Sequence, residues 1–148
     1  MSAASNYLEA KLLDHTLRYG SAPYVAPTTL YLALFKSDID AATTAANLEA
    51  GTTSTNEVAT AGSTAYARQP VTFAAATGTN PTSSATAATV TFDPATASWG
   101  TVTHIAVMDG DTRGSGNVLF YGAVTVSKTI DSGDTFQVTA GNLTISLA

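Results

Sequence analysis

The sequence contains no cysteine and few charged residues, and both absences exclude functions. Without cysteine, the chain has no disulfide, no thiolate metal site and no cysteine nucleophile. Its 6 lysines and arginines are outnumbered by 11 aspartates and glutamates, which leaves a net charge of -5. The basic residues stand singly and form no stripe that could neutralise phosphates, so we expect no nucleic-acid partner.

Long apolar runs are also missing. No stretch approaches the roughly 20 apolar residues of a membrane helix, and the start MSAASNYLEAKLLDH lacks the basic and apolar regions of a signal peptide. We therefore expect no membrane partner and synthesis in the cytoplasm. Charged residues are 11% of the chain, well below the usual share of about a quarter. Because charge is depleted at interface cores, this composition suggests a surface that partly faces other subunits.

The N-terminal residues predict the one convincing helix. Asn6 can cap it, with Glu9 three residues later as in a capping box. Asp14 and Arg18 form an i,i+4 pair in the favourable order, and Gly20 supplies a C-terminal stop. A broad apolar face is predicted for Leu8, Leu12, Leu13, His15 and Leu17.

The rest of the chain predicts a mainly β protein. Residues 28–35, TTLYLALF, alternate with apolar side chains on both faces, as in a strand covered on both sides. Short alternating strands with turn signals follow, which favours an antiparallel β-sandwich or a barrel-like variant. We divide the chain into an N-terminal helix and extended connector, 1–27, and a β-sandwich domain, 28–148. A polar arm at about 36–65, which neighbours would order, is inserted in that domain.

One strand carries a histidine that invites a catalytic interpretation. His104 would share a face with Val102, Ala106 and Met108, opposite Ile105 and its neighbours. A catalytic histidine needs a nucleophile or metal and an orienting carboxylate. The other histidine lies in the predicted helix and has no metal-ligand spacing to His104. We therefore predict a structural or subunit-contact role.

The stretch MDGDTRGSG resembles the start of a calcium loop. Arg113 stands where an oxygen ligand belongs, and Phe120 stands where a bidentate glutamate is needed. Asp109-Gly110 is a common hairpin signal, and Gly114 and Gly116 can adopt positive φ. A hairpin turn is favoured over a weak cation site.

Three other features bear on contacts inside the chain or between subunits. Arg68 could pair with an acid across a subunit boundary or be an ordinary strand-end arginine. Trp99 is expected as a core or interface anchor, and the N-terminal tyrosines Tyr7, Tyr19 and Tyr24 as contacts to a neighbouring surface. With no G-x-S-x-G and no carboxylate pair in an acid/base context, we assign no catalytic, cofactor-binding or metal-binding residue and expect no cofactor.

Five segments, in this order, resemble a family of small virion proteins of tailed bacteriophages: LEAKLLDHTLRY, PTTLYLALF, AYARQPVTFAAA, ATVTFDPATASWGTVTHIAVMD and GNVLFYGAVTVSKTIDSGDTFQVTAGNLTISL. The resemblance covers nearly the whole chain, and YARQ, WGTVTH and SGDTF are its most specific parts. Residues 36–65 match no pattern of the family. Members are often labelled tail fibre proteins, and similar small β proteins serve as capsid cement or decoration.

The resemblance implies a structural protein of the virion without enzymatic activity. Our first hypothesis is a capsid cement protein, a homotrimer that binds the outer surface of the major capsid protein shell and stabilises the head. The alternative is a tail or tail-fibre component that joins other virion proteins or meets the host surface. A carbohydrate-binding or hydrolytic β-sandwich stays open as a third class.

Overall fold

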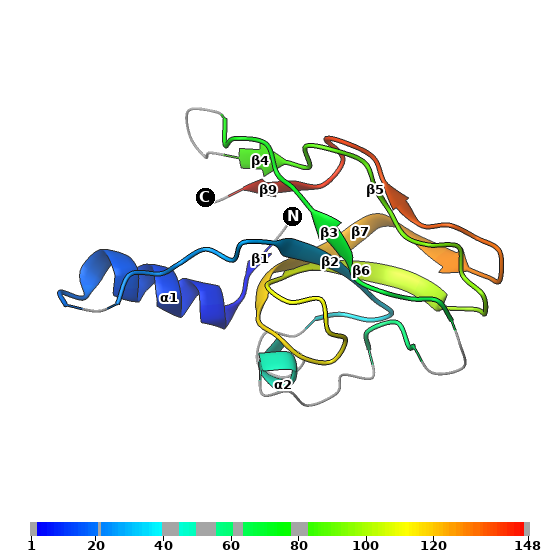
Figure 1. Cartoon of the computed structure of the whole chain (residues 1–148), viewed down its shortest axis with the longest axis horizontal. Helices are drawn as coiled ribbons and strands as arrows, with labels where there is room; N and C mark the ends of the chain where they lie inside the picture. The colour runs from blue at the N-terminus through cyan, green and yellow to red at the C-terminus, as the bar shows by residue number, and fades with distance from the viewer. Residues whose placement is uncertain are drawn as a thin grey trace.

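The computed structural model describes residues 3–20, 22–39, 45–49, 56–60, 64–77 and 83–146. The fold is mainly antiparallel β with one N-terminal helix, as predicted, and the helix projects from the body (Figure 1). A five-stranded sheet in the order β1-β7-β6-β2-β3 forms the centre, and two short ribbons, β4-β9 and β5-β8, accompany it.

The elements have the following bounds. The central sheet contains β1 (Ala3–Ala4), β2 (Leu30–Phe35), β3 (Gln69–Val71), β6 (Gly100–Met108) and β7 (Val118–Ile130). The ribbons contain β4 (Ser83–Ala85), β5 (Val90–Thr91), β8 (Gln137–Val138) and β9 (Thr144–Ser146). The helices are α1 (Asn6–Leu17) and α2 (Ala46–Glu49).

Strand β2 is covered on both faces, which confirms its predicted pattern. Leu32 and Leu34 belong to the larger core, while Ala33 and Phe35 belong to a smaller one on the opposite face. The strand pairs with β6 on one side and with β3 on the other. Pro70 in β3 lies at the edge of the sheet, where a missing N–H costs no ladder hydrogen bond.

The larger core is built around aromatic side chains. Tyr66, Phe92 and Trp99 lie with ring centroids 5.5–6.2 Å apart, and Phe136 joins them at 5.9 Å from Phe92. The indole Nε1 of Trp99 donates to the Thr64 carbonyl at 2.7 Å. Of the two roles expected for Trp99, the structure shows the core anchor.

The face predicted for Val102 is wrong because β6 and β7 lose their regular register. Val102 pairs with Lys128, whereas His104 pairs with Ala123, so three extra residues of β7 bulge between these pairs. Side chains alternate faces only while the ladder is regular. Val102 therefore packs in the larger core, and not with His104, Ala106 and Met108 as expected.

The described parts of residues 36–65 pack against their own chain. Ile39 and Leu48 are buried in the smaller core, and the Val58 N–H donates to the Leu34 carbonyl at 2.9 Å. The expectation that neighbouring molecules order this segment is therefore wrong for these parts, which close one face of the sheet. Residues 40–44, 50–55 and 61–63 lie outside the described residues.

The N-cap of α1 is Ser5 and not the predicted Asn6. Its hydroxyl oxygen accepts from the Leu8 N–H at 3.2 Å and donates to the Val118 carbonyl. Its own N–H donates to Leu119 O at 2.9 Å. One buried serine thus caps the helix and attaches it to β7, a double role that Asn6, exposed one residue later, does not have.

Candidate functional site

Residues 109–117, between β6 and β7, form a hairpin turn. The Asp109 carboxylate accepts from the Asn117 N–H at 2.7 Å and from its side-chain amide. Gly114 and Gly116 have φ values of 76° and 86°, as the turn prediction required. In the part of the chain that the structure describes, no three histidine, aspartate or glutamate side chains gather as a metal site would need.

His104 lies between a hydroxyl and a carboxylate. Its Nδ1 is 2.9 Å from Thr103 Oγ1, and its Nε2 is 3.2 Å from Asp38 Oδ1. This sequence of groups resembles a hydrolytic triad, but the orienting acid of such a triad is buried, whereas the Asp38 side chain is 81% exposed. The contact ties the residues after β2 to β6. His15 lies elsewhere, on α1, where its Nδ1 accepts from the Tyr24 N–H at 3.2 Å.

The strongest polar cluster is a buried ion pair between Glu57 and Arg68. Their side chains are fully buried and joined by two hydrogen bonds of 2.8 and 2.9 Å. Arg68 Nη1 also donates to the carbonyls of Gly110 and Ser115, at 2.8 and 3.0 Å. The Gly114 N–H donates to Glu57 Oε2 at 3.1 Å. The pair therefore joins the long polar segment to the β6–β7 hairpin.

Tyr66 completes this cluster. Its hydroxyl donates to Glu57 Oε1 at 3.1 Å and accepts from the Leu34 N–H at 3.0 Å. Burial, together with the nearby Glu57 carboxylate, raises the pKa of Tyr66 well above its ordinary value. Arg68 therefore pairs with Glu57 of its own chain and not with an acid across a subunit boundary. Sequence reasoning missed Glu57, because nothing in its polar surroundings marks it as buried.

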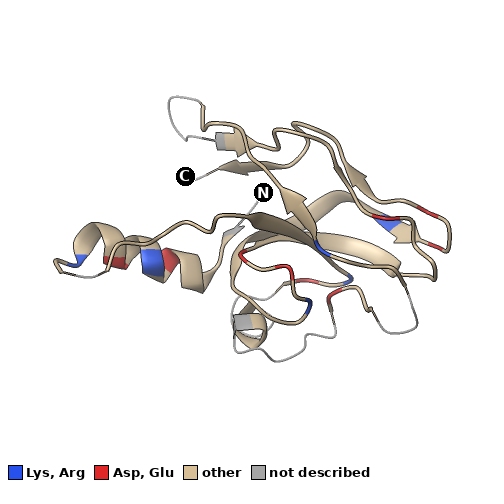
Figure 2. Cartoon of the chain, in the orientation of Figure 1, with Lys and Arg blue, Asp and Glu red and all other residues tan. Residues whose placement is uncertain are grey.

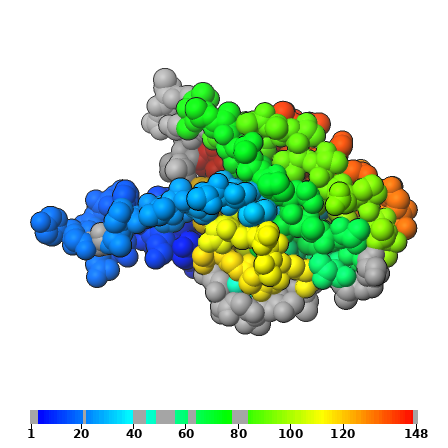
Figure 3. Space-filling model, viewed as in Figure 1, coloured from blue at the N-terminus to red at the C-terminus, as the bar shows by residue number. Residues whose placement is uncertain are grey.

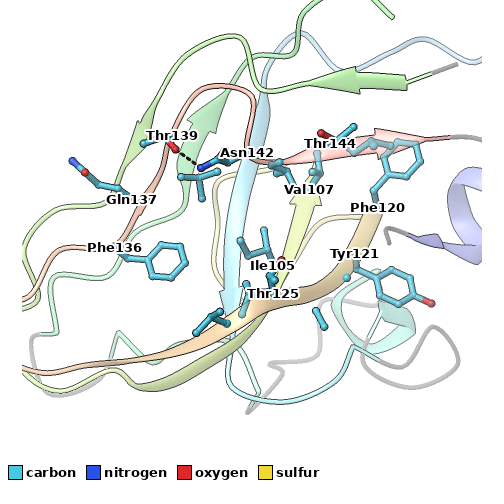
Figure 4. Close-up of a pocket in the computed structure, with 17 residues that line it drawn as sticks. Ile105, Val107, Phe120, Tyr121, Thr125, Phe136, Gln137, Thr139, Asn142 and Thr144 are labelled. Atoms are coloured by element: carbon cyan, nitrogen blue, oxygen red, sulfur yellow. Dashed lines mark hydrogen bonds between the residues drawn. The ribbon is translucent and has the colours of Figure 1, made fainter. Parts of the chain in front are cut away.

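A groove of about 480 Å³ lies between the central sheet and residues 136–145. Figure 4 shows Ile105 near the centre of the groove, with Phe120 and Thr144 to one side of it and Phe136 to the other. The groove exists because the two short ribbons leave part of β7 uncovered. Its lining includes half-buried apolar side chains and contains no Asp, Glu, Lys or Arg. The half-buried apolar residues are Phe120, Val124, Leu143 and Ile145.

The N-terminal arm, defined here as α1 and the connector after it, residues 6–20 and 22–29, projects from the body (Figure 3). Leu8 is the one buried residue of α1, whereas Leu13 and Leu17 are 57% and 78% exposed. Tyr19 is fully exposed and Val25 is 79% exposed. A helix of 12 residues is marginal by itself and normally depends on packing of its apolar face. The arm therefore presents an apolar surface that the described part of its own chain does not cover.

Comparison with known proteins identifies the family. A family model described as Podophage GP4 fiber I protein gp80 matches residues 3–146, almost the whole chain. The chain belongs to this family. It is therefore a bacteriophage virion structural protein, as the motif order suggested, and the family's name agrees better with the tail-fibre alternative than with our first hypothesis of capsid cement. Among proteins of curated function, none matches this sequence.

Membership of the fibre family directs attention to contact surfaces. A structural subunit of a virion must bind other virion proteins, and the groove and the arm are apolar surfaces available for such contacts. No described helix is long and apolar enough to cross a membrane.

Proposed function

We propose that this protein is a tail-fibre component that joins other virion proteins and so connects part of the fibre to the particle or to the host surface. The family match over residues 3–146 is the observation that carries this proposal. The projecting arm supports it, because an exposed apolar helix fits attachment to a neighbouring subunit. The chain lacks an internal repeat, so we place it at a joint or tip of the fibre and not in a repetitive shaft.

Capsid cement is the second candidate. A small chain of 148 residues without fibrous repeats also suits a decoration protein on the outer surface of the major capsid protein shell. Such proteins gain avidity when an oligomer touches several lattice points at once. For either location we propose a homo-oligomer, with a trimer as the first expectation.

Copy number per particle separates the two locations. We would quantify the protein against the major capsid protein by mass spectrometry of purified virions. A few to a few dozen copies are expected for a tail fibre. Hundreds of copies would reject the fibre location and favour cement, and absence from the virion would reject both.

We also propose that the protein has no catalytic activity. Exposure of Asp38 supports this, because an exposed carboxylate holds the His104 imidazole weakly. A glycan array and assays for glycoside and ester hydrolysis test the third class. Hydrolysis that is lost in the His104→Ala variant would overturn the proposal.

A further inference from the structure

We propose that the arm of one copy docks into the groove of a second copy, so that both apolar surfaces are covered in a closed homo-oligomer. This inference deepens the homo-oligomer of the proposed function by naming its contact surfaces. It does not depend on whether the protein lies in the tail or on the head.

The arm is built to present a stripe of side chains. On a helix, Leu13 and Leu17 are one turn apart and lie on the same face. Leu8 and Leu12 lie on a different face, and Leu8 packs into the body. The side chains of Tyr7 and Lys11 face the connector around Pro23. The exposed stripe is thus separate from both surfaces that the arm uses within its own chain.

The groove is long enough to receive the stripe. From Leu13 to Leu17 the helix rises about 6 Å at 1.5 Å per residue. The part of β7 that lines the groove, residues 120–126, spans about 23 Å at roughly 3.3 Å per residue. The groove volume of about 480 Å³ suits a row of side chains and is too small for a helix backbone.

Charge does not oppose the contact. The groove lining contains no charged residue, and the arm carries two acids and two bases, so it is neutral although the whole chain has a net charge of -5. Figure 2 shows both signs on α1 and none on β4 or β9. The exposed stripe itself is apolar, so docking would not bury an unpaired charge.

The area reaches the standard size of an interface when two copies exchange arms, whereas in a cyclic trimer each pair of copies shares one contact. Full burial covers about 100 Å² of an aliphatic side chain and about 200 Å² of an aromatic one. Leu13 and Leu17 are 57% and 78% exposed and Tyr19 is fully exposed, so these three side chains offer about 350 Å² in total. Val25 lines the surface between α1 and the connector and is not counted. With an equal area from the groove, one arm–groove contact buries about 700 Å², and the two contacts of an arm-exchanging dimer bury about 1,400 Å², within the standard range of about 1,200–2,000 Å².

The absence of cysteine makes a direct test simple. We would prepare full-length L17C and V126C variants, since Leu17 is on the arm, Val126 lines the groove, and both are about 80% exposed. When the two variants are mixed and oxidised, we expect the L17C–V126C disulfide to form at least tenfold more than L17C–L17C. In the matched control, L17C is mixed with Thr112→Cys, a variant in the exposed hairpin turn, instead of with V126C. Equal yields with V126C and T112C would overturn the proposal.

Sedimentation velocity of the native chain and of charge variants gives an independent test. We expect a closed oligomer for the native protein and for Thr112→Glu, and monomers for Leu17→Glu and for Val126→Glu. A native monomer over the whole concentration range, or an oligomer unaffected by both arm and groove variants, would reject the contact. Either result leaves the virion assignment intact, because copy number per particle is measured separately.

Discussion

Glu57 and Arg68 show how one buried ion pair can organise a chain with few charges. Each buried charge is compensated by several hydrogen bonds, and together they join three segments that are distant in sequence. A buried pair of this kind is costly to break because the remaining partner stays desolvated.

Glu57→Gln should therefore destabilise the protein strongly. The substitution leaves the Arg68 guanidinium buried without its counter-charge, and we expect a loss of about 3–5 kcal/mol in the free energy of unfolding. Urea denaturation measures it. Asp14→Asn is the matched control, because it breaks an exposed ion pair of 3.8 Å and should change stability by less than about 0.5 kcal/mol. Equal effects of the two variants would contradict the structural role of the buried pair.

We predict that the folded protein loses stability in alkali because of Tyr66. Its pKa is raised in the folded state, so between its ordinary pKa and the raised value the folded chain keeps a proton that the unfolded chain has lost. Stability contributed by Tyr66 is therefore complete below about pH 10 and falls as the pH rises further. Tyr66→Phe should flatten this fall, measured by urea denaturation from pH 8 to 11. Tyr19→Phe, at a fully exposed site, should not. An unchanged slope in Tyr66→Phe would assign the alkaline loss to other groups.

At the scale of elements, the β6–β7 hairpin depends on one glycine. Gly116 has a φ of +86°, and an added Cβ would lie 3.0 Å from Asp109 Oδ1. Gly116→Ala should cost about 1–2 kcal/mol through the left-handed backbone alone, read from the midpoint of urea denaturation. Gly110→Ala provides the comparison, because the space around that position is open and its φ is ordinary. If both variants have the same midpoint, the turn is not under this constraint.

The attachment of α1 to β7 through Ser5 gives a second prediction at the scale of elements. Ser5→Ala removes the N-cap and the bond to the Val118 carbonyl, so we expect the first turn of α1 to lose about 1 kcal/mol. Hydrogen exchange of the α1 amides should become about fivefold faster, which is that energy expressed as a rate ratio. Asn6→Ala should leave exchange nearly unchanged. A faster exchange in Asn6→Ala than in Ser5→Ala would restore the cap expected from sequence.

The elements also show which sequence patterns were sufficient to predict local structure. The apolar alternation of β2 and the positive-φ glycines of the hairpin are local patterns, and both predictions were confirmed. The face of Val102 could not be predicted, because it depends on how the partner strand β7 bulges. The motif order was sufficient to place the chain in a phage virion family.

At the scale of the whole molecule, self-association should make thermal stability depend on concentration. If the arm and the groove cover each other between copies, folding and assembly are linked and Tm rises with protein concentration. We expect a rise of several degrees over a hundredfold range of the native protein, followed by scanning calorimetry, and a smaller one for Leu17→Glu. Thr112→Glu should behave like the native chain. A concentration-independent native Tm would argue against a stable oligomer.

The sequence by itself determined the mainly β fold, the N-terminal helix, the hairpin turn and the family, because each depends on short-range periodicity or on motif order. Only the tertiary structure decided which residues become buried partners. Glu57 meets Arg68, Ser5 caps and attaches α1, and the incomplete second layer opens a groove along β7. Apart from the Ser5 cap itself, these contacts join separate segments of the chain, as Ser5 does with Val118, and no local pattern specifies the distance between such segments.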